Sequence, residues 1–163
     1  MNDYIKDREY LQIVKDILMD DEFIKLKKIK HHGDNRRDHC LRVSYECYRI
    51  CKKRGLHYKE IARAALLHDF FLIKYEDLNY FKRFKLLFTH PKIALENAEK
   101  ITELSEIERN IIESHMFPIG RAFPKYKESW LIGVVDDYVA IYERLHYVPR
   151  NIRNYFRKEQ RNH

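Results

Sequence analysis

A histidine and an aspartate stand side by side inside one of the most apolar stretches of the chain. His68 and Asp69 interrupt the run AALLHDFF, between four small or aliphatic residues and two phenylalanines. Burying an imidazole beside a carboxylate costs free energy unless both groups gain partners. A divalent cation would serve both, because neutral imidazole and carboxylate are ligands for zinc, iron, manganese and nickel.

Similar residues intrude on apolar helical patterns elsewhere in the chain. His39 borders an apolar arc, and His115 continues the i, i+4 row of Ile107 and Ile111. Alone, each has a plain structural explanation, because a single inward histidine is usually a satisfied core residue. As a set from separate helices, they supply the ligands of a metal centre. The set consists of His39, His68, Asp69, His90, His115 and one of the adjacent residues Asp136 and Asp137, between which helical phase does not decide.

The elements that must position these residues are predicted to be helical. Apolar residues recur at helical spacing almost throughout the chain, without the alternation that is typical of a strand. The fold class expected is all-α, a single bundle of about six or seven helices around the metal site. We expect helices over about 3–18, 34–55, 58–69 and 125–147, another that begins at His90, and one that ends before Pro118, with 74–89 ambiguous.

Particular residues indicate where these helices begin and end. Gly55 suits the position just after a helix, and Pro91 suits a first turn. Ser105 and Glu108 have the spacing of a capping box. The last long helix is expected to present one apolar face, made of Leu131, Val135, Tyr138, Tyr142 and Leu145.

The composition is that of a folded protein. The 163 residues are 45% hydrophobic and 35% charged, which argues against a disordered chain. No apolar run approaches the roughly 18–20 residues of a membrane helix, and the first residues lack a secretory apolar segment. We therefore expect a cytoplasmic protein with one domain over 1–163, including a helical N-terminal extension (1–33) and a basic C-terminal tail (150–163).

Three cysteines fit a reducing compartment. Cys40, Cys47 and Cys51 all fall in one predicted helix. There Cys40 and Cys47 would be roughly 10 Å apart along the axis, too far for a disulfide. We expect small buried thiols.

The net charge of +7 predicts attraction to anions without naming one. Two segments, FKRFK (81–85) and 150–163, interleave basic and aromatic residues. Such segments can follow a nucleic-acid backbone or lie on an anionic membrane surface. The plainer interpretation is a solvated helix face and a frayed tail.

The order H…HD…H…H…D in a helical chain resembles the HD superfamily of metal-dependent phosphohydrolases. The resemblance covers roughly 35–146 and is closest to a bacterial branch of hydrolases with no assigned substrate. The blocks that carry it are RRDHCLRV, ARAALLHDFF, FTHPKIALENA, ESHMFP and ESWLIGVVDDYVAIYE.

The resemblance implies a ligand set. His39, His68, Asp69 and the final aspartate would bind one metal ion, and the surrounding pattern VVD-x-Y favours Asp136, with Asp137 as the alternative. His90 and His115 match the extra histidines of two-metal members, in which Asp69 would bridge both ions. We therefore expect two divalent transition-metal ions per chain, from among Fe, Mn, Zn, Ni and Co.

The implied activity is hydrolysis of a phosphate ester or anhydride in a nucleotide or other small phosphorylated substrate, by hydroxide that the metal activates. Asp69 and His68 would act at the catalytic centre, and Arg36, which matches the pattern R-x-x-H, would contact a phosphate. Further candidates are the basic residues Lys74, Arg121, Lys125 and Lys127, and His31 or His32 as a general acid.

Two other functions stay open at this point. Some HD-fold proteins with the same six-ligand pattern resemble di-iron oxygenases that cleave C–C or C–P bonds with O₂. Alternatively, the basic segments bind nucleic acid or another polyanion, and the metal site is structural.

Overall fold

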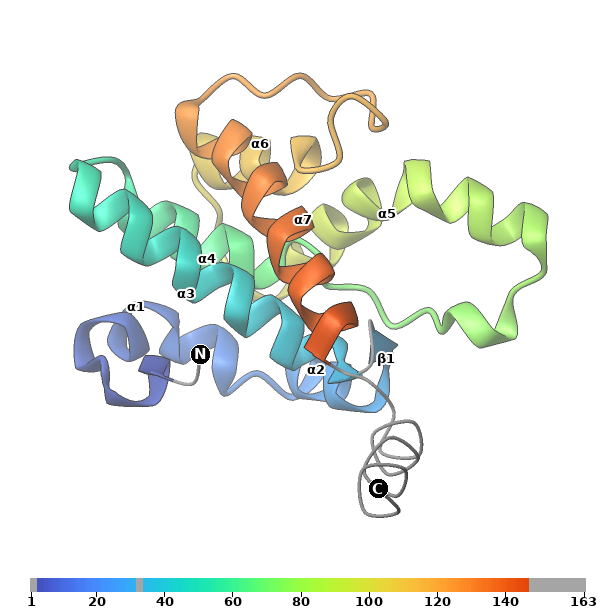
Figure 1. The fold of residues 1–163 in the computed structure, drawn as a ribbon, viewed down its shortest axis with the longest axis horizontal. Helices are drawn as coiled ribbons and strands as arrows, with labels where there is room; N and C mark the ends of the chain where they lie inside the picture. The colour runs from blue at the N-terminus through green and yellow to red at the C-terminus, as the bar shows by residue number, and fades with distance from the viewer. Residues whose placement is uncertain (1–2, 32–33, 147–163) are drawn as a thin grey trace, which may run out of the picture.

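The computed structural model describes residues 3–31 and 34–146, which are almost entirely helical (Figure 1). Three short 3-10 turns, Asp3–Lys6, Lys25–Lys28 and Tyr75–Asp77, join or precede helices. The α-helices are α1 (Arg8–Leu18), α2 (Asp21–Ile24), α3 (Arg36–Arg54), α4 (Tyr58–Leu67), α5 (Tyr80–Ile101), α6 (Glu106–Ser114) and α7 (Lys127–His146). The all-α prediction is confirmed.

One pair of very short strands accompanies the helices. β1 (Lys30–His31) runs antiparallel to β2 (Asp34–Asn35), with Lys30 opposite Asn35. Strands of two residues are too short to leave an alternating pattern, so the sequence does not indicate them.

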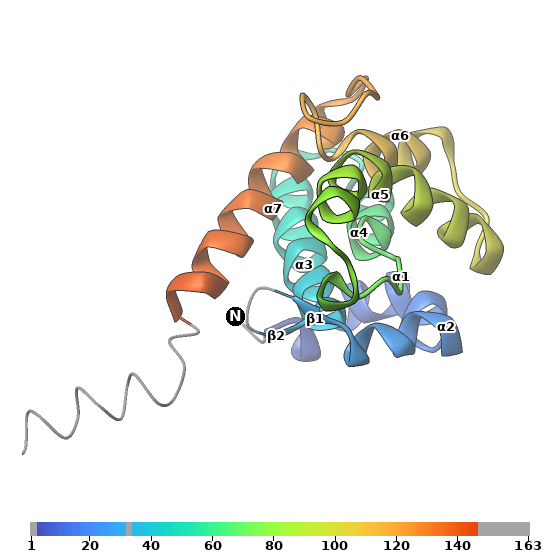
Figure 2. The ribbon, with the colours of Figure 1, turned by 90° about the vertical axis from the view of Figure 1, so that its right-hand side faces the viewer.

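Helices α3 and α4 form the centre of the molecule. They lie side by side, with α1, α6 and α7 packed around them and α5 against α6 (Figures 1 and 2). The core combines buried aromatic rings such as Tyr10, Phe23 and Tyr48 with aliphatic side chains, among them Leu66, Leu67, Ile111, Ile112, Ile132 and Val139.

Several predicted helix ends are confirmed. Gly55 follows α3 in the left-handed region, at φ 65°, where glycine meets no Cβ penalty. Ser105 and Glu108 form the capping box of α6. Helix α4 ends at Leu67, so the doublet of His68 and Asp69 stands at the point where the chain leaves the helix.

The predicted helix start at His90 is wrong. Helix α5 begins ten residues earlier, at Tyr80, and passes through His90 and Pro91. The N-cap is Asn79, whose side chain accepts a hydrogen bond from the backbone N–H of Lys82. Pro91 sits inside the helix, where a proline removes one backbone hydrogen bond.

The predicted apolar face of the last helix is also wrong as a buried face. In α7 the inward residues are Ile132, Val135 and Val139, whereas Tyr138 and Leu145 are exposed. The inward face also carries Asp136 and Glu143, and these two carboxylates make it look polar in the sequence. Of the predicted face, Val135 is buried and Leu131 packs partly buried against the core.

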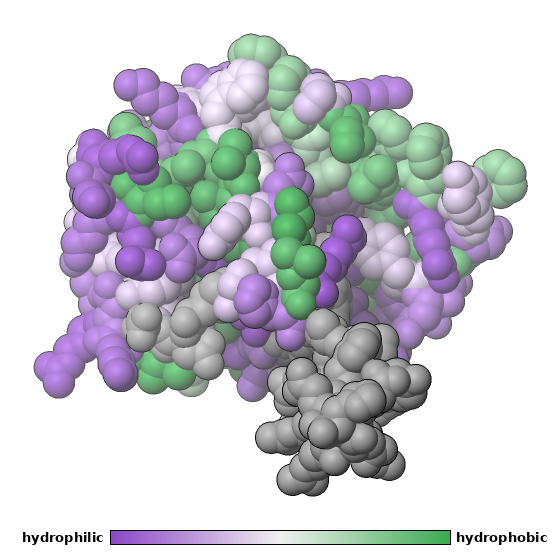
Figure 3. Space-filling model, in the orientation of Figure 1, coloured by the Kyte–Doolittle hydropathy of each residue, from purple (hydrophilic) through white to green (hydrophobic). Residues whose placement is uncertain are grey.

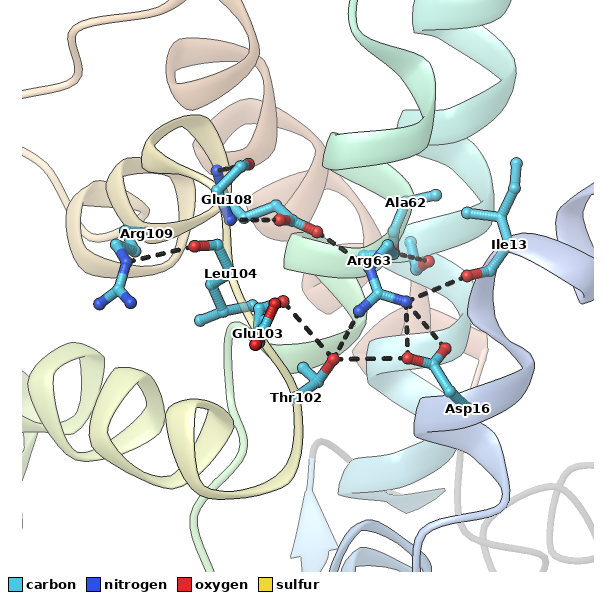
Figure 4. Close-up of polar contacts among 11 residues, drawn as sticks. Ile13, Asp16, Ala62, Arg63, Thr102, Glu103, Leu104, Glu108 and Arg109 are labelled. Atoms are coloured by element: carbon cyan, nitrogen blue, oxygen red, sulfur yellow. Dashed lines mark hydrogen bonds and ion pairs between the residues drawn. The ribbon is translucent and has the colours of Figure 1, made fainter.

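An arginine joins three helices on the side away from α7 (Figure 4). Arg63 of α4 donates from Nε to Glu108 of α6, at 3.0 Å, and from Nη1 to Asp16 of α1, at 2.8 Å. Its Nη2 donates to Thr102 Oγ1 at 2.7 Å. This network fixes the ends of α1 and α5 against α4 and α6.

Cys40, Cys47 and Cys51 are buried and free, as expected. Among the described helices, none combines the length and the hydrophobicity needed to cross a membrane.

Candidate metal centre

Five segments bring histidine and aspartate side chains to one place in the interior. Helix α3 supplies a histidine from its first turn, α5 one from its middle, and α4 and α6 supply residues at or just after their last turns. Helix α7 crosses them with an aspartate. The residues brought together are His39, His68, Asp69, His90, His115 and Asp136.

One half of the cluster lies between α3, α4 and α7. His39 Nε2 is 2.8 Å from Asp136 Oδ1, and His68 Nε2 is 3.5 Å from the same oxygen. Both imidazoles are wholly buried, and Asp136 is partly buried.

The other half lies between α5, α6 and the end of α4. His90 Nε2 and His115 Nε2 are 3.1 Å apart. Asp69 Oδ1 is 3.4 Å from the first and 3.9 Å from the second. Asp69 also groups with His39 and His68, with ligand atoms within 4.8 Å of one another, so this carboxylate borders both halves.

Three of the histidines are oriented by backbone carbonyls. The Nδ1 atoms of His68, His90 and His115 lie 2.7, 3.1 and 2.8 Å from carbonyl oxygens one helical turn earlier. Because a carbonyl only accepts, each neutral ring carries its proton on Nδ1 and turns the Nε2 lone pair inward. Among the described residues, the buried Nε2 of His68 has no hydrogen-bond partner.

The fourth histidine is oriented by a carboxylate. His39 Nδ1 lies 3.0 Å from Glu143 Oε2, and Glu143 Oε1 accepts a hydrogen bond from Arg42 at 2.5 Å. A histidine that binds a metal typically donates its second N–H to such an acceptor. The sequence reasoning missed Glu143, although it lies two helical turns after Asp136 and therefore on the same face of α7.

A family model for the HD domain matches residues 36–150, which is more than half of the chain. The chain belongs to the HD-domain family. No curated protein and no solved structure gives a significant match.

The electrostatics of this HD-domain cluster suit a cation. Burial, together with the neighbouring His68 and His90, lowers the pKa of His115 to about 4, so this imidazole is neutral and able to ligate at pH 7. Burial would lower the pKa of His39, but hydrogen bonds to Asp136 and Glu143 raise it to about 10. A proton on His39 Nε2 therefore occupies the place that a cation would take.

The aspartate of α7 that joins the HD-domain cluster is Asp136. Burial would raise the pKa of Asp136, but His68 and His39 hold it well below its ordinary value, so it is ionised. Asp137, about 100° further round the helix, is exposed and belongs to none of the candidate metal groups among the described residues.

The residues present fit a divalent cation by two observations. The Nε2 atoms of four imidazoles converge on two carboxylates, and the buried Nε2 of His68 has no hydrogen-bond partner among the described residues. Nitrogen and oxygen donors of this kind suit Zn, Fe, Mn, Co and Ni.

Arg36 does not take the position expected for a phosphate contact. It is wholly buried, and its Nη1 donates to the carbonyl oxygens of Phe71 and Ile73, the second at 3.3 Å. Its guanidinium lies 3.7 Å from the centre of the Phe71 ring. Arg36 thus fixes the chain that follows the HD doublet, and through it the direction of Asp69.

The other basic candidates lie on the surface. Lys74, Arg121, Lys125 and Lys127 are exposed. The segment 81–85 forms the exposed start of α5. The expectations for His32, for the side chain of His31 and for the tail 150–163 lie outside the described residues.

Proposed function

We propose that this HD-domain protein is a metal-dependent phosphohydrolase that holds two divalent cations and cleaves a phosphate ester or anhydride in a small substrate such as a nucleotide. The observation that carries the proposal is the set of four inward Nε2 atoms with two carboxylates between them. Each of the four rings has its other nitrogen engaged, so the set is preorganised for ligation.

The division of the cluster supports two cations. His39, His68 and Asp136 surround one position, and His90 and His115 lie together at the other, with His115 also within 4.8 Å of ligand atoms of His68 and Asp136. Asp69 borders both and is the candidate bridge. The two metal ions of a paired site typically lie about 3.5–4 Å apart, and one carboxylate can bind both ions at that separation.

Divalent cations there would supply Lewis-acid activation of water and of a phosphoryl oxygen. The chain itself holds the ligands in place: Glu143 orients His39, and Arg36 anchors the segment that carries Asp69. The ionised state of Asp136 keeps a negative charge available to the cations. The positive net charge of the chain favours the approach of an anionic substrate.

The test compares two neighbouring aspartates. Asp136→Asn and Asp137→Asn change the same group on adjacent residues, but only the first alters the cluster. Phosphate release from a panel of nucleotides and other phosphate esters is measured after loading with Mn, Fe, Zn, Co or Ni. We expect Asp136→Asn to lose at least about a hundredfold in rate and Asp137→Asn to keep the wild-type rate.

Two results would contradict the proposal. Turnover that requires iron and O₂ and releases no phosphate would assign the chain to the oxygenases instead. A protein that binds no metal after loading would also contradict the proposal, because the hydrolysis needs a bound cation.

A further inference from the structure

Helix α7 is apolar on two opposite faces. Its inner face packs Ile132, Val135 and Val139 into the core. A second row runs along the outer side over almost the whole helix, and its members are between 51% and 69% exposed. At about 100° per residue the row falls within an arc of about 80°. We call it the outer stripe; it consists of Trp130, Val134, Tyr138, Ile141 and Leu145.

The outer stripe continues into the loop before α7. Trp130 contacts the rings of Phe117 and Phe123 edge-on, with centroids 5.3 and 6.0 Å away. Both phenylalanines are themselves exposed, at 37% and 60%. Figure 3 shows hydrophobic surface along the line of α7, which crosses the front of the molecule in Figure 1.

The size of this surface matches that of a protein interface. A half-exposed side chain of this size has on the order of 100 Å² of solvent-accessible surface. The outer stripe and the two phenylalanines, seven side chains, therefore expose about 700 Å². The largest apolar patch on a typical monomer is about 300–600 Å². A stable interface buries about 800 Å² per partner.

The spacing of the outer stripe suits another helix. Its members follow one another at intervals of four, four, three and four residues, the alternation of a helix–helix seam. Asp137 and Arg144 stand on the same flank of the stripe, with opposite charges two helical turns apart. In an antiparallel pair of identical helices related by a two-fold axis, these flanks meet and Asp137 of each copy faces Arg144 of the other.

The charge around the outer stripe argues against an anionic membrane as the occupant. Of the four charged residues in 130–145, Asp136 and Glu143 lie on the inner face, so the outer stripe is flanked by Asp137 and Arg144, whose charges cancel. The start of α5 differs, because residues 80–92 contain four basic residues and no acidic one. Two chains that each carry a net charge of +7 meet with least repulsion through their least basic face.

We propose that two copies of this chain form a dimer in solution through the outer stripe, with α7 of one copy packed antiparallel against α7 of the other. The metal cluster lies on the inner side of the same helix. Dimerisation would therefore cover α7 from outside without occupying the site.

The first test is the mass of the full chain in solution. Sedimentation equilibrium at micromolar concentrations is expected to give twice the chain mass of 20.1 kDa. Val134→Glu and Ile141→Glu each place a charge in the seam and are expected to weaken the dimer at least about a hundredfold. Phe81→Glu is the matched control, because Phe81 is 80% exposed on α5 and should leave the dimer intact.

A second measurement locates the axis and separates dissociation from misfolding. The native cysteines are buried, so an introduced Tyr138→Cys or Ile141→Cys provides the accessible thiol. We expect one of them to form a disulfide-linked dimer under mild oxidation, whereas Phe81→Cys does not. Helix content and metal content of the glutamate variants should equal those of the wild type.

A chain that stays monomeric at all concentrations would overturn the proposal, and the occupant of the stripe would then be the segment 147–163 or another protein. A dimer that Phe81→Glu breaks, and that Val134→Glu leaves intact, would also overturn it. Neither outcome bears on the phosphohydrolase proposal, which is tested by metal and phosphate release.

Discussion

Glu143 should control how tightly the cluster holds a cation, although it is not one of the proposed ligands. Its Oε2 lies 3.0 Å from His39 Nδ1, and its Oε1 accepts from Arg42. Replacing it by glutamine keeps the shape but leaves only one acceptor oxygen. If the amide oxygen faces His39, the amide NH₂ faces the Arg42 guanidinium; if it faces Arg42, the NH₂ favours the His39 tautomer with its proton on Nε2.

The expected magnitude follows from either arrangement. Loss of the partner that orients a ligating histidine typically lowers metal affinity about 10–100-fold. Glu143 is buried and bonded on both oxygens, so we expect about a 30-fold loss for Glu143→Gln, or about 2 kcal/mol of binding free energy. The ligand count stays the same, so a saturated variant should still take up the same number of ions.

The assay is competition for zinc or manganese with a chromogenic chelator, followed by metal analysis at saturation. Glu46→Gln is the matched control, because Glu46 also pairs with an arginine from α3 but at the surface. An affinity of Glu143→Gln within twofold of the wild type would refute the reasoning. So would a loss of stoichiometry, since that would make Glu143 a ligand.

Three further predictions concern stability. Removing the metal with a chelator should lower the melting temperature by roughly 5–10 °C, because a ligand at a hundred times its Kd contributes about 2.7 kcal/mol; an unchanged melting curve would contradict a tight site. Arg63→Ala should cost about 2–3 kcal/mol in urea unfolding, because it leaves Glu108 buried without its partner; a cost below 1 kcal/mol would show that the network is dispensable. Burial would raise the pKa of Glu128, but hydrogen bonds from the backbone and ring of His57 lower it below its ordinary 4.5. The ionised Glu128 therefore stabilises the fold above pH 4.5, and this stabilisation is lost as the pH falls through the lowered pKa. Glu128→Gln should make the free energy of unfolding fall less steeply at acid pH. The same acid dependence in the variant and the wild type would refute this role of Glu128.

The sequence carried enough information to place most of the cluster. The side chains of His68 and Asp69 reach one centre because α4 ends at Leu67. Two adjacent polar residues in an apolar run indicated that the helix ends there, because both can face one point only at a helix end. Gly55 and the pair Ser105 and Glu108 marked helix ends through local backbone chemistry, which depends on few residues.

Other features depended on contacts that no local pattern records. The start of α5 was missed because Asn79 is a weaker signal than a proline, and Pro91 favoured a first turn over an interior position. The face of α7 was misjudged because its inward side contains Asp136 and Glu143, whose partners come from α3. Arg36 matched a sequence motif, but only the fold shows that its Nη1 donates hydrogen bonds to the carbonyl oxygens of Phe71 and Ile73. The assignment of one domain to residues 1–163 stays a prediction.

The most direct measurement of the central claim is the metal content of the purified, tag-free chain beside a variant in which His90→Ala and His115→Ala are combined. We expect about two transition-metal ions per wild-type chain and about one in the variant, because the variant keeps His39, His68, Asp69 and Asp136 but loses both histidines that group with Asp69 at the second position. His146→Ala, a change of the same type at the exposed end of α7, should leave the content at two. No bound metal after loading, or equal content in the wild type and the double variant, would contradict the two-cation site.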